Sequence, residues 1–128
     1  MKVVINKCYG GFGLSIKATT EYLKLKGKEP YFYNMAKRKV FNPTSDFVYI
    51  LTKDYGDILT DYAHEDYFSE YDIPRNDPDL ITVVESLGKE SWGQCSELEI
   101  IEIPDDIEWE VNDYDGREWI SEKHRVWS

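Results

Sequence analysis

A cluster of glycines near the start of the chain constrains the fold more than any other feature of the sequence. Residues 2–7 (KVVINK) contain a short apolar run and are predicted to form a buried strand. Gly10, Gly11 and Gly13 follow and end that strand, because residues without a side chain favour turns. A helix is then predicted over residues 16–26. The chain therefore begins with a strand, a glycine-rich turn and a helix.

This arrangement is one that binds anions in many proteins. Glycines let the backbone approach a ligand closely, and free amides together with the helix dipole favour negative charge. Ser15 is the predicted N-cap of the helix, but the turn has neither the Gly-Lys-Ser/Thr of a P-loop nor a GxGxxG pattern. We expect either a tight structural connection or a site for a small anionic or nucleotide-like ligand, with these candidate residues: Lys7, Tyr9, Gly10, Gly11, Gly13 and Ser15.

The middle of the chain predicts two further strands and a long polar segment. Residues 31–33 (YFY) form a short strand after Pro30, and the basic tripeptide 37–39 is placed on a loop. The continuous apolar run 47–52 (FVYILT) predicts a central strand that is buried on both faces. The Asp- and Tyr-rich stretch 53–76 is long for a loop, so we expect a short helix within it.

A second helix, a strand and a hairpin are predicted after residue 76. Asp77 is the predicted N-cap of the helix, with Pro78 at its first position and Gly88 at its end. Residues 97–103 alternate acidic and apolar side chains and predict a strand. Residues 107–126 predict an antiparallel hairpin with a type I′ turn. The turn is Asp115-Gly116, and the register pairs Val111 with Ile120 and Glu108 with Lys123.

The predicted order of elements is β-α-β-β-α-β-β-β. It defines an α+β fold with two helices and a mixed sheet of about five to six strands, ending in the C-terminal antiparallel hairpin. A chain of 128 residues with 41% apolar residues suits one globular domain, spanning residues 1–128.

The charge of the chain is strongly asymmetric. The formal net charge is −10, but residues 1–41 carry nine Lys or Arg and two Glu, whereas residues 42–128 carry six Lys or Arg and twenty-three Asp or Glu. Phosphate repulsion makes double-stranded nucleic acid an unsuitable partner for such an acidic chain. Either the two regions neutralise each other in part, or the acidic region is a surface for a basic partner.

The two cysteines, Cys8 and Cys95, form neither a CxxC unit nor a zinc pattern. No apolar stretch resembles a membrane span or a secretory signal, so we expect free thiols, a cytoplasmic setting and no membrane partner. A nucleophilic Cys8 would need a base, and both histidines, His64 and His124, are distant in the sequence. The CxxxxxR phosphatase pattern is also absent.

A metal site is one further arrangement to consider. Four residues in the polar stretch have a spacing that places them on one face if the stretch is helical: Asp54, Asp57, Asp61 and His64. Gly56 and the flanking acids favour a solvated segment instead, so the sequence predicts no metal and no cofactor.

Three cations outside the glycine-rich turn are also candidates for ligand binding. Arg75 precedes the second helix, and His124 and Arg125 lie beside Trp127 in the tail. An arginine next to an aromatic ring holds a phosphate or stacks on a base. The structural alternative is that Asn76-Asp77-Pro78 sets a helix cap and that the tail is a solvated strand.

The opening KVVINKCYGGFGLS, residues 2–15, resembles a family of small phage and prophage proteins. The likeness extends to residues 75–78 and 85–88, and to the tail at 103–106, 114–116 and 122–127, with a variable middle between about residue 29 and residue 74. The resemblance implies an origin in a bacteriophage genome and a site of action in the cytoplasm of an infected or lysogenic host. It carries no catalytic residues over.

These observations favour a non-enzymatic accessory binding protein, because no set of residues supplies a nucleophile, a base and a group that orients them. Its ligand-binding residues would be those of the glycine-rich turn together with Arg75, His124 and Arg125. The first alternative is an acidic module that engages a host protein through the Tyr-rich segment 54–72. The second is a small hydrolase or transferase acting on a nucleotide. The sequence leaves a homo-oligomer open.

Overall fold

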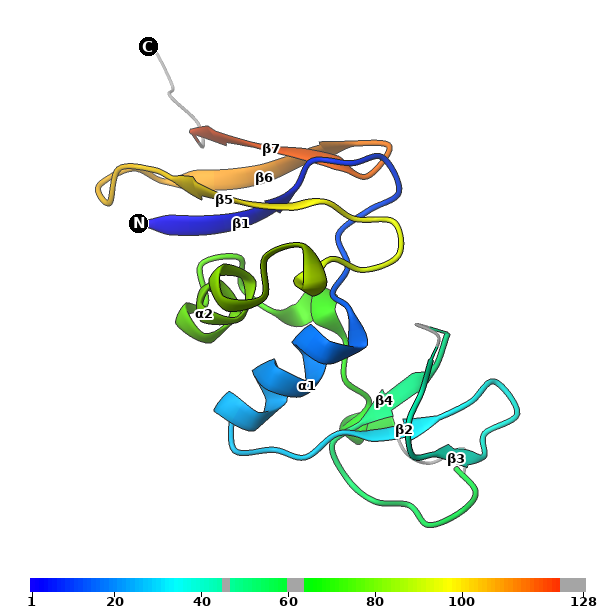
Figure 1. The fold of residues 1–128 in the computed structure, drawn as a ribbon. Coiled ribbons are helices and arrows are strands. Elements are labelled where there is room, and N and C mark those ends of the chain that lie inside the picture. The colour runs from blue at the N-terminus through cyan, green and yellow to red at the C-terminus, as the bar shows by residue number, and fades with distance from the viewer. Residues whose placement is uncertain (45–46, 60–63, 123–128) are drawn as a thin grey trace.

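A computed structural model describes residues 1–44, 47–59 and 64–122 of the chain (Figure 1). Within these ranges the chain forms two α-helices, seven strands and three short 3₁₀ helices. The helices and strands are β1 (Lys2–Asn6), α1 (Ile16–Leu25), β2 (Tyr31–Tyr33), β3 (Lys39–Val40), β4 (Tyr49–Leu51), α2 (Pro78–Leu87), β5 (Leu98–Glu102), β6 (Trp109–Tyr114) and β7 (Arg117–Glu122). The 3₁₀ helices are His64–Asp66, Glu70–Asp72 and Gly88–Ser91.

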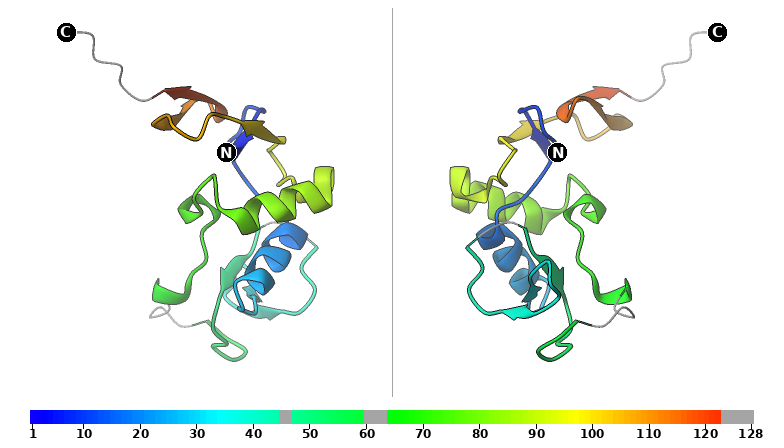
Figure 2. Two further views of the ribbon diagram at one scale, coloured as in Figure 1. Left: turned by 90° about the vertical axis from the view of Figure 1, so that its left-hand side faces the viewer. Right: turned by 90° about the vertical axis from the view of Figure 1, so that its right-hand side faces the viewer.

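The described strands belong to three antiparallel sheets. β1 pairs with β5, β2 lies between β3 and β4, and β6 pairs with β7. Figures 1 and 2 show β1, β5, β6 and β7 at one end, the two helices in the middle and β2–β4 at the other end. The α+β class, the two helices and the C-terminal hairpin are confirmed. The helices separate the β2–β4 sheet from the other strands, and β1–β5 and β6–β7 are two further sheets, so the described residues form no single mixed sheet.

Both helices begin and end where the sequence predicts. The Ser15 hydroxyl accepts a hydrogen bond from the amide of Ala18, and Gly27 follows α1 with a φ of 74°. The Asp77 carboxylate accepts hydrogen bonds from the first turn of α2, and Gly88 ends that helix with a φ of 56°.

The main core lies between the two helices and the β1–β5 sheet. Val4 points from β1 toward the helices, while its neighbours Val3 and Ile5 point to the opposite face and are also fully buried. The buried members of this core are Val4, Phe12, Leu14, Ala18, Tyr22, Leu23, Ile73, Leu80, Val83, Val84 and Leu98. A second small cluster, formed by Tyr33, Leu51 and Leu59, stabilises the β2–β4 sheet.

The apolar run 47–52 does not form the central strand that its composition predicts. β4 covers only Tyr49–Leu51 and lies at the edge of its sheet, and Phe47 is 67% exposed. The central position belongs to β2, because Lys39 and Val40 form the additional strand β3 on its other side. The loop predicted for the basic tripeptide 37–39 therefore ends at Arg38, and Lys39 begins β3.

The hairpin forms with the predicted turn and register. Asp115 and Gly116 have φ values of 54° and 88°, as a type I′ turn requires, and Val111 pairs with Ile120. Lys123 lies outside the described residues. Neither α-helix in the described ranges is long and apolar enough to cross a membrane.

Candidate functional site

The first half of the glycine-rich turn packs against the hairpin turn. The amide of Gly10 donates a hydrogen bond to the carbonyl of Asp115 at 3.0 Å. A Cβ atom on Gly116 would clash with the backbone amide of Gly11. The two turns therefore approach so closely that residue 116 has to be a glycine.

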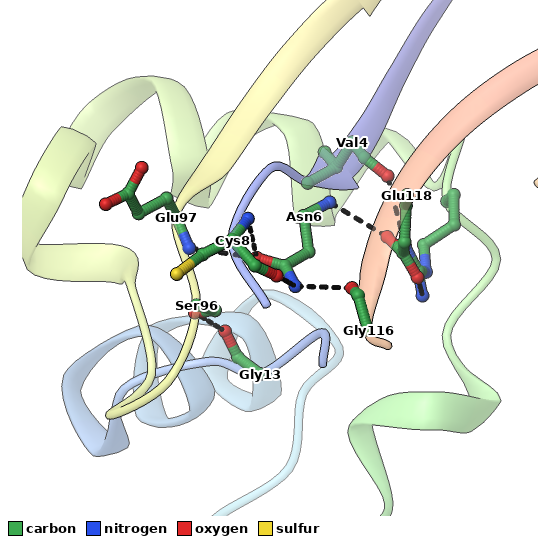
Figure 3. A network of polar contacts seen from close by, with 9 residues as sticks. Val4, Asn6, Cys8, Gly13, Ser96, Glu97, Gly116 and Glu118 are labelled. Carbon is green, nitrogen blue, oxygen red and sulfur yellow. Dashed lines mark hydrogen bonds and ion pairs between the residues drawn. The ribbon is translucent and has the colours of Figure 1, made fainter. Parts of the chain in front are cut away.

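The second half of the turn packs against the loop that follows α2. The amide of Gly93 donates to the carbonyl of Gly13 at 3.1 Å, and a Cβ atom on Gly93 would lie 2.9 Å from that carbonyl carbon. The Ser96 hydroxyl donates to the same carbonyl at 2.7 Å (Figure 3). The amide of Ser15 donates to the carbonyl of Ser91 at 2.9 Å. The Gly10 and Ser15 amides are thus bonded within the protein and are not free to hold an anion.

Asn6, at the end of β1, joins three segments through its side chain (Figure 3). It is fully buried, and its Nδ2 donates to the carbonyls of Cys8 and Gly116, both at 2.7 Å. Its Oδ1 accepts from the amides of Cys8 at 3.2 Å and Glu97 at 2.9 Å. These four bonds use the full capacity of the side chain and hold the glycine-rich turn, the hairpin turn and the start of β5 together.

Arg75, a predicted anion ligand, instead binds a carboxylate of the protein. Its guanidinium donates to both oxygens of Glu118, at 2.5 and 2.7 Å, and lies 3.7 Å from the ring centroid of Phe12. Glu118 is only 7% exposed, and its Oε1 also accepts from the Asn6 amide at 2.8 Å. Because each charge needs the other once it is buried, Arg75 is engaged in structure and is not available to a ligand.

A small pocket opens beside this network, and we call it the hairpin pocket. Its volume is about 230 Å³, and it is lined by Lys7, Tyr9, Tyr114, Arg117, Glu118 and Trp119. Three of these residues have exposed aromatic side chains: Tyr9 at 57%, Tyr114 at 71% and Trp119 at 47%. The pocket therefore presents two cations and three rings to solvent.

Strand alternation explains how β7 builds two different surfaces. Glu118 points inward to Arg75, while its neighbours Arg117 and Trp119 point to the opposite face, where they are exposed. Tyr114 pairs directly with Arg117 across the hairpin and shares that face. Lys7 enters from the chain after β1, which Asn6 holds against the hairpin turn.

A larger hollow, which we call the aromatic cleft, lies on the other side of the glycine-rich turn. Its volume is about 430 Å³. Residues 11–14 and 93–95 form one wall together with Ile16 and Thr19 of α1, and residues 47–50 and 67–71 form the other wall. Gly11 and Gly13 thus line a hollow, but one whose opposite wall consists mainly of aromatic side chains.

Gly10, Ser15 and Arg75 line neither hollow. His124 and Arg125 lie outside the described residues, as does Asp61 of the considered metal set. Residues 54–59 are not helical, and Asp54 forms an ion pair with Lys39 at 2.5 Å, so these residues do not form the helical face that was considered for a metal site. Within the described part of the chain, no three His, Cys, Asp or Glu side chains are placed to hold a metal ion.

A group of coupled ionisable side chains lies between the helices, away from both hollows. Burial raises the pKa of Tyr22 to about 12, and its hydrogen bond to Asp77 adds to the effect. Burial alone would raise the pKa of Asp77, but hydrogen bonds from Tyr22, from the Asp79 amide and from Lys26 outweigh it and lower that pKa below its ordinary value. Hydrogen bonds to Asp79 and Asp77 raise the pKa of Lys26. This group links α1 to the N-terminus of α2.

The basic and acidic regions of the sequence pair with each other in the fold. Lysines of residues 1–41 form ion pairs with described acids between residues 54 and 99. These pairs are Lys2–Glu85, Lys7–Glu99, Lys17–Glu90, Lys26 with Asp77 and Asp79, and Lys39–Asp54. The two regions therefore neutralise each other in part, which was one of the two interpretations of the charge asymmetry.

Sequence reasoning found Lys7 and Tyr9 but missed the residues that face them. Arg117 and Trp119 alternate with inward-facing residues of a predicted strand, so their shared exposed face was open to prediction. Asn6 is a polar residue directly after a buried apolar run, which also marks it as unusual. The chain matches no protein-family model, no curated protein and no solved structure.

Proposed function

We propose that this chain is a non-enzymatic binding protein for a small anionic, nucleotide-like ligand, and that the ligand occupies the hairpin pocket. The observation that carries the proposal is that Lys7 and Arg117 share one pocket with the exposed rings of Tyr9 and Trp119. A nucleotide offers a phosphate to the cations and a flat base to the rings, so one molecule satisfies both kinds of side chain.

The size of the hairpin pocket favours a single nucleotide. Pockets that enclose drug-sized ligands have volumes of about 300–1,000 Å³. The hairpin pocket, at about 230 Å³, has room for one base or one phosphate, and the rest of the ligand stays in water. A site of this kind corresponds to a dissociation constant between about 10 µM and about 1 mM.

The charges in and around the pocket also support an anionic ligand. Glu118 is neutralised by Arg75, and Lys7 reaches Glu99 only at 3.8 Å, in an exposed pair that exchanges easily with another anion. The Arg117 side chain makes no hydrogen bond or ion pair with any described residue. Its guanidinium is thus ready to bind a phosphate.

The residues of the pocket give less support to an enzyme. None of the described side chains that line it is a Cys, His, Ser or Thr, and its carboxylate, Glu118, is held by Arg75 and is not available as a general base. The resemblance to phage proteins suits a binding role, in which the protein sequesters a nucleotide in an infected host.

Calorimetric titration with AMP, GMP, CMP and UMP tests the proposal. We expect Arg117→Gln to weaken binding about tenfold through the loss of one phosphate contact, and Trp119→Leu to remove any preference among the four bases. Lys24→Gln is the matched control, because Lys24 is an exposed cation on α1 that lines neither hollow. Absence of binding up to about 5 mM, or unchanged binding by Arg117→Gln, overturns the proposal.

A further inference from the structure

The aromatic cleft has a chemistry different from that of the hairpin pocket. Rings from two segments form its wall: Phe47, Tyr49, Tyr67, Phe68 and Tyr71. Tyr49 and Tyr67 pack edge to face, with ring centroids 5.8 Å apart. At the rim, Phe47 is 67% and Tyr71 69% exposed. The cleft thus offers fixed rings inside and accessible rings at its mouth.

Two polar side chains that line this cleft, Thr19 and Glu70, can each accept a hydrogen bond from a ligand. The Thr19 hydroxyl is buried, in a residue that is 1% exposed, and has no hydrogen-bond partner among the described residues. Such a group costs free energy unless a ligand or a water satisfies it. Glu70 is the only charged residue that lines the described cleft, so the charge of the site is negative.

We propose that the aromatic cleft binds an arginine side chain on a basic segment of a partner protein. A guanidinium stacks on aromatic rings, is attracted by a carboxylate and carries enough N–H groups to reach the Thr19 hydroxyl as well. The net charge of −10 adds a long-range attraction for a basic segment. Such a segment is therefore attracted both by the carboxylate in the cleft and by the charge of the whole chain.

Other occupants fit the cleft less well. An anion would be repelled by Glu70 and by the net charge of −10. A purely apolar group would leave the Thr19 hydroxyl unsatisfied. A second copy of this chain also carries a net charge of −10, so two acidic surfaces would have to meet. The inference concerns a site separate from the hairpin pocket and stands whether or not a nucleotide binds there.

Titration of the intact protein with three peptides tests this inference. The probes are a decapeptide of alternating Gly and Arg, the same peptide with citrulline in place of Arg, and free arginine amide. Citrulline keeps the shape of arginine but has no charge, so we expect its peptide to bind at least about tenfold more weakly. Arginine amide should bind more weakly than the Arg peptide, because it carries fewer positive charges for the net charge of −10 to attract.

Variants assign the binding to the cleft. We expect Tyr71→Ala and Glu70→Gln each to weaken the Arg peptide by about three- to tenfold, since each removes one cation–π or charge contact. Phe41→Ala is the control, because Phe41 is an exposed ring, at 80%, that lines neither the aromatic cleft nor the hairpin pocket. The melting temperature of each variant checks that the fold is kept. Equal binding of the citrulline peptide, equal binding of arginine amide, or loss of binding in Phe41→Ala alone overturns the inference.

Discussion

Asn6 shows how much a single buried polar residue contributes to this fold. Its replacement by Ala would leave the amides of Cys8 and Glu97 without the oxygen that accepts from them. Four partly buried hydrogen bonds are lost in all, each with a net contribution of about 0.5–1.5 kcal/mol, so we expect Asn6→Ala to lower the free energy of unfolding by about 3 kcal/mol. Urea denaturation measures the change. Asn76→Ala is the control, because that side chain is exposed and should change the stability by less than about 0.5 kcal/mol.

For Thr19 we expect the opposite effect, a gain in stability when the polar side chain is replaced by an apolar one. Its hydroxyl is buried without a partner, and Val has nearly the same shape, so Thr19→Val should stabilise the protein by about 1 kcal/mol. Thr82 in α2 is the matched comparison, because its hydroxyl is satisfied by the carbonyl of Pro78 at 2.9 Å. Thermal unfolding of the two variants should show a rise in melting temperature for Thr19→Val alone. A fall for Thr19→Val would mean that the hydroxyl has a partner, such as an ordered water, in solution.

At the scale of elements, the contact of the glycine-rich turn with its neighbouring loops is a backbone contact. Gly93 does not have a positive φ, yet a Cβ atom there would lie 2.9 Å from the Gly13 backbone. Gly27 has a φ of 74° but open space around its Cβ position. We expect Gly93→Ala to destabilise the protein by more than about 2 kcal/mol, and Gly27→Ala by about 1 kcal/mol. Denaturant unfolding of both variants separates the effect of packing from that of backbone strain, and equal losses would contradict the packing role.

The link between the helices should appear in the acid stability of the protein. The pKa of Asp77 is lowered in the folded state, so its stabilising effect is fully present above the unfolded pKa of about 3.9. This effect is lost as the pH falls through the lower folded pKa. Asp77→Asn keeps a residue that can cap α2 but removes the charge, and it should flatten the dependence of stability on pH below about pH 4. Urea midpoints between pH 2 and pH 6, with exposed Asp106→Asn as control, measure the difference.

Local chemistry was enough to predict the helix caps and the hairpin turn, but not how the helices and strands pack against one another. The caps at Ser15 and Asp77 and the turn at Asp115-Gly116 each depend on neighbouring residues only, and the sequence shows them directly. The pairing of Arg75 with Glu118 joins residues far apart in the chain and has no local pattern. For the same reason, the predicted anion ligands of the glycine-rich turn could not be distinguished from residues that pack against other loops.

The apolar run 47–52 illustrates a second limit. A continuous apolar stretch suits a central strand, but it equally suits an edge strand whose side chains line a hollow. Val48, Tyr49 and Ile50 line the aromatic cleft, and this accounts for the composition of the run without a central position. The cleft itself depends on a second segment, residues 67–71, whose approach to β4 the sequence did not reveal.

For the whole molecule, the distribution of charge separates the two proposed sites. The hairpin pocket places two cations on a chain with a net charge of −10, so attraction near the pocket is opposed by repulsion at longer range. In the aromatic cleft, by contrast, the local charge and the net charge have the same sign. A nucleotide and a basic peptide should therefore respond differently to ionic strength.

We expect the affinity for the Arg decapeptide to fall steeply between about 20 mM and about 300 mM salt, because screening weakens the local and the long-range attraction together. The affinity for a mononucleotide should fall less, because salt weakens the contact with Lys7 and Arg117 but also screens the repulsion by the rest of the molecule. Parallel titrations at four salt concentrations give the two slopes. Equal slopes would show that both ligands respond to the same part of the surface, and the two sites would then not be independent.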